Sequence, residues 1–245
     1  MNTARVILAL VPVTVAVAFL VHWMTLTHIK DPRDRLPYCR GAYLALSFQL
    51  LLFVWIVFRI FDAPSPVAWL IPLSMTCSFA GDFFNLHFDS VAKRTKEPLF
   101  WGIISFALAQ FCYIAAFLSL VSLSTLTFEG YFIPVLIALL VVPAVLFRLR
   151  VYNPARPTSL MAGAFIYGFI LGGMAAVAIS AAIALGGAWY CVAAGALFFL
   201  LSDAVMGETT IYGRHPSFEF QVPWFTYLVA QGFIITGSVM LAAGV

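Results

Sequence analysis

The stretch Ala196-Leu-Phe-Phe-Leu-Leu-Ser-Asp-Ala-Val-Met206 places one carboxylate inside an otherwise apolar run, and Cys77-Ser-Phe-Ala-Gly-Asp-Phe-Phe-Asn-Leu86 does the same. Apolar runs of about 20 residues cross the hydrocarbon of a bilayer as helices. An ionisable side chain inside such a span is costly and indicates a functional site. Asp82 and Asp203 are therefore the first candidate site residues.

Composition agrees with a membrane location for the whole chain. Of 245 residues, 63% are hydrophobic and 9% are charged, which lies far outside the range of soluble domains. The predicted spans leave no room for a soluble domain, so we expect residues 1–245 to form a single transmembrane domain. The four cysteines show no metal-binding or redox spacing and are expected to be reduced packing residues.

The apolar runs predict an all-α bundle of eight transmembrane helices. The first run, 6–26, is too long for a signal-peptide core and is predicted to be a retained span. Pro134 and Pro143 predict a kink or local unwinding in the fifth helix, and Gly168 and Gly172 form a GxxxG pattern typical of close helix packing. The predicted spans are 5–27, 38–61, 67–86, 98–121, 130–148, 158–184, 187–207 and 223–243.

Basic residues separate strongly between the two sides of this arrangement. Eleven fall on one side and only Arg5 and Arg59 on the other, which predicts cytoplasmic basic loops and two non-cytoplasmic termini. The positive charge therefore reports topology, and nothing in the sequence supports nucleic-acid binding. The eleven are Lys30, Arg33, Arg35, Arg40, Lys93, Arg94, Lys96, Arg148, Arg150, Arg156 and Arg214.

The two halves of the chain share a spacing. Gln110 follows Asp82 by 28 residues and Gln231 follows Asp203 by the same 28, so the halves are offset by 121 residues. The same offset carries the first and second predicted spans onto the fifth and sixth. This suggests a duplicated unit of four helices, with parallel half-repeats at 1–122 and 123–245.

Both aspartates are predicted at one depth, about four residues before the cytoplasmic end of a span. Further polar side chains fall in the same half of the membrane and are candidate substrate-binding residues. Gln and Tyr in spans also serve as interhelical hydrogen-bond partners. An alternative is that each aspartate anchors a helix end, Asp82 with Arg40 or Lys93 and Asp203 with Arg214. The candidates are Asn85, Gln110, Tyr113, Tyr167, Ser202, Tyr227 and Gln231.

Four histidines lie near the predicted cytoplasmic boundary and raise the possibility of a metal site. None of them forms a pair with the spacing of a zinc motif, so interfacial solvation is the simpler interpretation. We predict no metal and no organic cofactor. The histidines are His22, His28, His87 and His215.

Four segments together resemble the YhhN-type lysoplasmalogenase family of eight-span membrane proteins. They are Phe79-Ala-Gly-Asp-Phe-Phe-Asn-Leu86, Phe100-Trp-Gly-Ile-Ile-Ser-Phe106 with Tyr113, Leu197-Phe-Phe-Leu-Leu-Ser-Asp203, and Tyr227-Leu-Val-Ala-Gln231. The resemblance covers about residues 67–243. Its most specific part is the pair of aspartate signatures in separate spans.

The resemblance implies hydrolysis of the vinyl-ether bond of lysoplasmalogens, giving a fatty aldehyde and a glycerophospho-base. It places Asp82 and Asp203 in the suspected catalytic positions and implies no cofactor. The chain departs from the family pattern at two places: Gln110 stands where the pattern has His, and Arg40-Gly41 where it has Lys-Pro. Gln cannot shuttle a proton as His can, so a non-catalytic lipid-binding relative is one alternative.

Two carboxylates in different protonation states suit vinyl-ether hydrolysis, with one as general acid and the other as cation stabiliser and base. The apolar flanks of Asp203 favour it as the acid. A single-chain lipid such as a lysophospholipid would enter from the bilayer with its headgroup at the basic rim. A proton-coupled transporter of small molecules or lipids is the other alternative, since intramembrane acids and repeats are typical of transporters too.

Overall fold

The computed structural model describes residues 20, 23–24, 32–60, 65–86, 88, 91, 93–214 and 221–244. These residues are helical without any strand, as predicted, and seven of the helices are long and apolar enough to cross a membrane. The first predicted span lies almost entirely outside the described residues. The structure therefore supports an integral multi-pass membrane protein with at least seven of the expected spans.

The helices follow the predicted spans closely. They are α2 (Pro32–Ile60), α3 (Ser65–Asn85), α5 (Pro98–Leu120), α6 (Leu123–Phe128), α7 (Phe132–Leu146), α8 (Thr158–Leu185), α9 (Trp189–Met206) and α10 (Gln221–Ala242). The short α6 was not predicted, because six residues carry too little periodicity to be recognised. Its N-terminus is capped by Ser122, whose hydroxyl accepts a hydrogen bond of 3.1 Å from the backbone N–H of Thr125.

Two helices end in a turn of π-helix. η1 (Phe147–Val151) continues α7, and η2 (Gly207–Tyr212) continues α9. The expected unwinding of the fifth span is thus displaced: the α-helix passes through both prolines and changes to π-helix four residues after Pro143. Pro134 stands in the first turn, where its missing N–H costs no intrahelical hydrogen bond. Short π-helical turns are frequent at functional sites.

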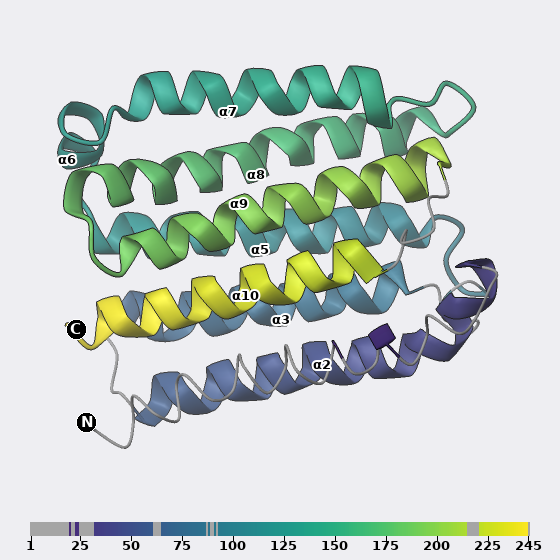
Figure 1. Ribbon diagram of the computed structural model, residues 1–245, viewed down its shortest axis with the longest axis horizontal. Helices are drawn as coiled ribbons and strands as arrows, with labels where there is room; N and C mark the ends of the chain where they lie inside the picture. The colour runs from purple at the N-terminus through teal and green to yellow at the C-terminus, as the bar shows by residue number, and fades with distance from the viewer. Residues whose placement is uncertain are drawn as a thin grey trace.

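Figure 1 shows the helices running side by side, with α7 at one edge of the bundle and α2 at the opposite edge. α3 packs on α5 as α9 packs on α10, and α2 packs on α3 as α8 packs on α9. Two residue pairs separated by 121 positions also touch: Asn85 with Met206, and Phe106 with Tyr227.

α7 is attached to the bundle mainly through α8, and none of its side chains is fully buried. Pro143 has no N–H, so it leaves the carbonyl of Leu139 without its usual helical donor. That carbonyl lies directly over Gly172 of α8, at the place where a Cβ would stand, and Gly168 faces Pro143 one turn away. The GxxxG pattern therefore serves close helix packing, as the sequence indicated.

Most of the basic residues that the structure describes lie at one end of the bundle. α3, α7 and α9 end there, whereas Arg59, in the last turn of α2, lies at the opposite end and stacks over Trp69, with 4.2 Å from its guanidinium carbon to the ring centroid. α10 also ends at the opposite end (Figure 1). Among the described residues, this separation of charge matches the predicted one.

Replacing Gly172 by Ala should weaken the contact between α7 and α8. The new methyl group would collide with the backbone oxygen of Leu139, which cannot move without shifting α7, and overpacking of this kind costs about 1–3 kcal/mol. Gly173→Ala is the matched control, because its Cβ meets no atom within 4 Å and Ala favours helix. Thermal unfolding of the purified variants in detergent should show a lower midpoint for Gly172→Ala only.

Candidate functional site

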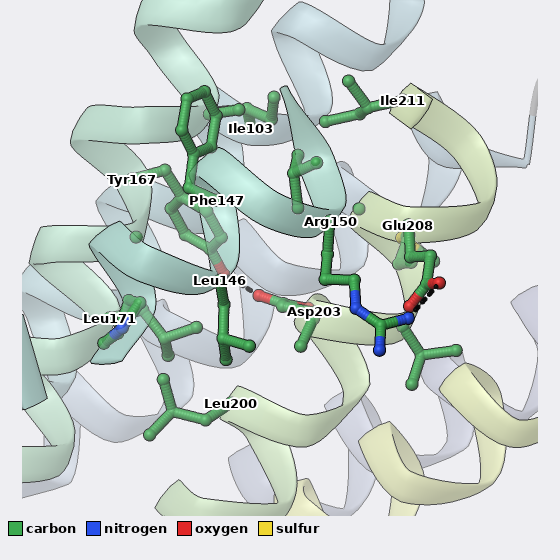
Figure 2. A pocket seen from close by; sticks show the side chains of 18 of the residues that line it. Ile103, Leu146, Phe147, Arg150, Tyr167, Leu171, Leu200, Asp203, Glu208 and Ile211 are labelled. Carbon is green, nitrogen blue, oxygen red and sulfur yellow. Dashed lines mark hydrogen bonds and ion pairs between the residues drawn. The ribbon is translucent and has the colours of Figure 1, made fainter. Parts of the chain in front are cut away.

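A cavity of about 470 Å³ opens at the basic end of the bundle, between α5, α7, α8 and α9. Its wall is mostly aliphatic and aromatic, with few polar side chains (Figure 2). Both π-helical turns contribute to it, η1 through Phe147, Arg150 and Val151, and η2 through Gly207, Glu208 and Ile211. The turns lie so close that a Cβ on Gly207 would stand 2.9 Å from a methyl group of Val151.

Two acidic residues line the cavity, Glu208 at its rim and Asp203, which is half-buried on α9. The hydroxyl of Tyr167, from α8, donates a hydrogen bond to Oδ2 of Asp203. Figure 2 shows Asp203 pointing toward Tyr167, with Arg150 and Glu208 facing each other beside it. The Asp203 carboxyl group therefore contacts the Tyr167 hydroxyl and also faces the interior of the cavity.

Asp82 lies outside the lining of this cavity, and only 3% of its surface is exposed. Its Oδ2 accepts hydrogen bonds from the hydroxyl of Ser47 in α2 and from that of Tyr227 in α10, the latter at 2.8 Å. Phe106 lines the cavity and packs edge-on against Tyr227, with 6.0 Å between ring centroids.

A second set of polar side chains ties the helices together behind Asp82. The Tyr113 hydroxyl donates to Oε1 of Gln231 at 2.5 Å, and Nε2 of Gln231 donates to Ser78 at 3.2 Å. Ser202 donates to the carbonyl of Pro223 at 2.9 Å. All four side chains are buried, so they act as interhelical links.

Gln110 and Asn85 each carry a buried polar atom that has no hydrogen-bond partner among the described residues. Both amide atoms of the fully buried Gln110 are in this state. Asn85 lines the cavity, and its Nδ2 lies 3.5 Å from the sulfur of Met206 while Oδ1 has no partner. Such groups in a folded protein need an explanation, for which a water or a ligand is the usual one.

Of the nine residues expected at the site, Asn85, Tyr167 and Asp203 line the cavity together. The other six, which do not line it, are Asp82, Gln110, Tyr113, Ser202, Tyr227 and Gln231. Sequence reasoning missed Glu208 and treated Arg150 only as a topology marker. Their charges at a helix end gave the only available signal, and that signal does not distinguish a pocket rim from a solvated loop.

The alternative in which Arg214 anchors Asp203 is wrong. Nη1 of Arg214 pairs with Oε1 of Glu208 at 2.6 Å, and Arg150 pairs with the same oxygen at 3.0 Å. Asp82 is likewise bound by hydroxyl groups, as described above. All four histidines lie outside the described residues, and the described part of the chain contains no group of three or more potential metal ligands.

Removing the hydroxyl of Tyr227 should destabilise the protein more than removing that of Tyr167. Tyr227→Phe leaves the buried Asp82 with one donor fewer, which costs about 1–3 kcal/mol. Asp203 faces the cavity and can recruit water in Tyr167→Phe. Thermal unfolding should rank the variants in this order, with the exposed Tyr190→Phe as control; equal midpoints for Tyr227→Phe and Tyr190→Phe would contradict a structural role of the bond.

Comparison with known proteins identifies a family. The model of the YhhN family matches residues 42–239, which include both aspartates and the whole lining of the cavity. No curated protein and no solved structure matches the chain. The match extends over most of the sequence, and the chain belongs to the YhhN family.

Proposed function

We propose that the protein hydrolyses the vinyl-ether bond of lysoplasmalogens, releasing a fatty aldehyde and a glycerophospho-base. One observation carries the proposal: Asp203 stands in the wall of a largely apolar cavity whose rim carries ionic side chains. Such a cavity suits a molecule with one hydrocarbon chain and a polar head. Family membership is consistent with this activity.

The reaction begins with transfer of a proton to the β-carbon of the vinyl ether, which forms an oxocarbenium ion. Asp203 is the group placed to donate this proton, since it is the carboxyl side chain that faces the cavity beside Tyr167. The Tyr167 hydroxyl donates to the carboxylate that remains and so stabilises it. A positioned general acid typically contributes a rate factor of about 100 to 10,000.

Water then adds to the oxocarbenium ion, and the resulting hemiacetal collapses to the aldehyde and the glycerol hydroxyl. The ionised Asp203 can accept the proton released by the attacking water, which restores the acid for the next cycle. Asn85 also lines this cavity, but its Oδ1 is buried against Gly102 of α5. The attacking water is therefore assigned to Asp203 alone.

Asp82 is proposed to support the reaction from behind the cavity wall. It is almost fully buried and accepts two hydroxyl hydrogen bonds, which suit its ionised form. An ionised Asp82 would favour the positive charge of the oxocarbenium ion through space. Its contribution does not require contact with the substrate.

Transport is the weaker proposal. The residues that line the cavity come from the basic ends of α5, α7 and α9 and from the basic half of α8, and the deepest are Leu139, Leu171 and Leu200. No described residue from Trp189 to Phe199, the opposite half of α9, lines it. A pocket reached from one end of the bundle suits lipid chemistry better than passage across the membrane.

A lipid-binding relative without activity would also use this cavity. Gln110, which prompted that alternative, does not line the cavity, so its replacement of a His removes no group from the wall. The acid required by the proposed mechanism is retained in Asp203. These two points favour an enzyme.

We also infer that the two halves descend from one duplicated four-helix unit. Equivalent helix pairs pack alike, and the contacts of Asn85 with Met206 and of Phe106 with Tyr227 join equivalent positions. Residues beside a two-fold pseudosymmetry axis meet their own equivalents in this way. On this view the second half kept an open cavity beside Asp203, whereas in the first half side chains enclose Asp82.

Replacing Asp203 by Asn should abolish aldehyde release. The purified protein is given a 1-alkenyl lysophosphocholine, with the saturated 1-alkyl lipid as substrate control, and free aldehyde is measured. Asp203→Asn should lower kcat by about 100-fold or more, because the amide cannot donate the proton. Asp82→Asn should lower both kcat and the unfolding midpoint, since it disrupts a buried hydrogen-bonded group.

Glu129→Gln is the matched control, an exposed carboxylate in the turn after α6, at the end opposite the cavity. It should leave kcat unchanged. Full activity of a folded Asp203→Asn protein would rule out the mechanism. Absence of any aldehyde from the unmodified protein, with lipid binding intact, would instead support the non-catalytic alternative.

The basic end is proposed to face the cytoplasm. In a chain whose four cysteines are replaced by Ala, Ser124→Cys should react with a membrane-impermeant maleimide in intact cells, and Lys96→Cys should react only after permeabilisation. Both positions are exposed, and they lie at opposite ends of the bundle. The reverse labelling pattern would invert the topology.

A further inference from the structure

The rim of the cavity carries three charged side chains that share one oxygen atom. Oε1 of Glu208 accepts from Nη1 of Arg150 at 3.0 Å and from Nη1 of Arg214 at 2.6 Å. Two guanidinium groups thus surround one carboxylate, and the cluster has a net charge of about +1. Arg150 and Glu208 belong to the cavity lining, whereas Arg214 lies outside it.

The cluster is held in place by the turns that carry it. Nδ2 of Asn153 donates to the carbonyls of Ile211 and Tyr212, at 3.3 and 3.1 Å. Arg156 donates to the carbonyls of Ile211 and Thr210, at 3.2 and 2.9 Å. These bonds pair the last carbonyl groups of η2. They also hold the segment after η1 against η2, so the position of the rim is fixed.

Arg150 is the cation of this cluster that remains available to a ligand. Arg214 forms the shorter bond to Glu208 and also lies over the ring of Tyr212, 4.8 Å from its centroid. Arg150 forms the longer bond, is 54% exposed in its side chain, and lines the cavity. A guanidinium has five N–H donors in a planar fork that matches the oxygens of a phosphate.

The spacing between this rim and Asp203 fits one class of lipid. Glu208 follows Asp203 by five residues, which is roughly 7 Å along the helix. In a glycerol lipid, five single bonds join the ether oxygen at position 1 to the phosphorus at position 3, a length of the same order. When the ether bond of such a lipid lies beside Asp203, the phosphate of the same lipid therefore reaches the rim.

The opposite end of the cavity is suited to the hydrocarbon chain. Leu139 of α7, Leu171 of α8 and Leu200 of α9 line the cavity there, and none of the described lining residues at that end is charged. Since α7 has no buried side chain of its own, this wall borders the bilayer. The chain of the lipid and its phosphate are thus separated along one cavity.

We propose that Arg150, braced by Glu208 and Arg214, is the phosphate-binding residue of the cavity and makes it select phosphate-bearing single-chain glycerol ethers over neutral ones. This inference rests on the proposed function for the place of the ether bond at Asp203, but binding tests it without catalysis. Arg150 releases part of its bond to Glu208 and pairs with the phosphate, while Arg214 keeps Glu208 neutralised.

The test compares two ligands that the reaction cannot cleave. A saturated 1-alkyl lysophosphocholine and a 1-alkylglycerol of the same chain length are titrated into the purified full-length protein in lipid nanodiscs. The unmodified protein should bind the phospholipid at least about tenfold more tightly, as expected for one charge-assisted contact. Arg150→Gln should remove most of this preference and leave the affinity for alkylglycerol unchanged.

Arg148→Gln is the matched control. Arg148 belongs to the same π-helical turn but stacks on Tyr152, 5.2 Å from its centroid, and does not line the cavity. It should keep the full preference. Arg150→Lys, which retains the charge without the planar fork, should keep an intermediate preference and serves if Arg150→Gln fails to fold.

Several outcomes would overturn the inference. Equal binding of both ligands by the unmodified protein would do so, as would an equal loss of preference in Arg148→Gln and Arg150→Gln. Competition by inorganic phosphate or glycerophosphocholine as strong as that of the lipid would identify a site for a soluble phosphate instead. Failure of the unmodified protein to hydrolyse the 1-alkenyl lipid, with its preference for the phospholipid intact, would instead reject the proposed function and leave this inference standing.

Discussion

The structure depends on one constraint, which is that a carboxyl group in an apolar bundle must find polar partners on other helices. Asp82 meets it with Ser47 and Tyr227, which lie 35 residues before it and 145 after it. Asp203 meets it with a hydrogen bond from Tyr167, and its carboxyl group also faces the cavity. Because an unpaired charge in this setting is expensive, these bonds bring α2, α3 and α10 together at one place and α8 and α9 at another.

The two aspartates have different surroundings, and this difference leaves only one of them facing the cavity. Phe106 and Tyr227 lie 121 residues apart in sequence and pack against each other, yet Tyr227 donates to Asp82 while Phe106 has no group that could donate to Asp203. Tyr167 supplies the donor for Asp203 from α8 instead. One carboxyl group is enclosed as a result, and the other faces a cavity. The prolines and glycines of α7 and α8, together with the two π-helical turns, shape that cavity and bring Arg150 and Glu208 to its rim.

Much of this could be predicted from local sequence. Apolar runs define helices whatever their neighbours, so the bounds of α5 and α8 agree with prediction to within a residue or two. Asp203 and Tyr167, which line the cavity together, could be chosen as candidates from the cost of polar groups in lipid. The relation between Asp82 and the cavity could not be predicted, because equal depth along two helices does not fix which face each presents. Glu208 was missed for a related reason: its role arises from contact with Arg150, 58 residues away.

The sequence by itself determined the membrane class, the helices and the family, since each of these depends on residue type and spacing along one chain. It also marked the two carboxyl groups whose burial demands explanation. Only the tertiary structure decided that Asp203 opens to a cavity and Asp82 does not, that Tyr113 and Gln231 link helices instead of lining the site, and that the rim is charged. These outcomes depend on the rotation of each helix about its axis and on contacts between distant segments, which packing alone determines.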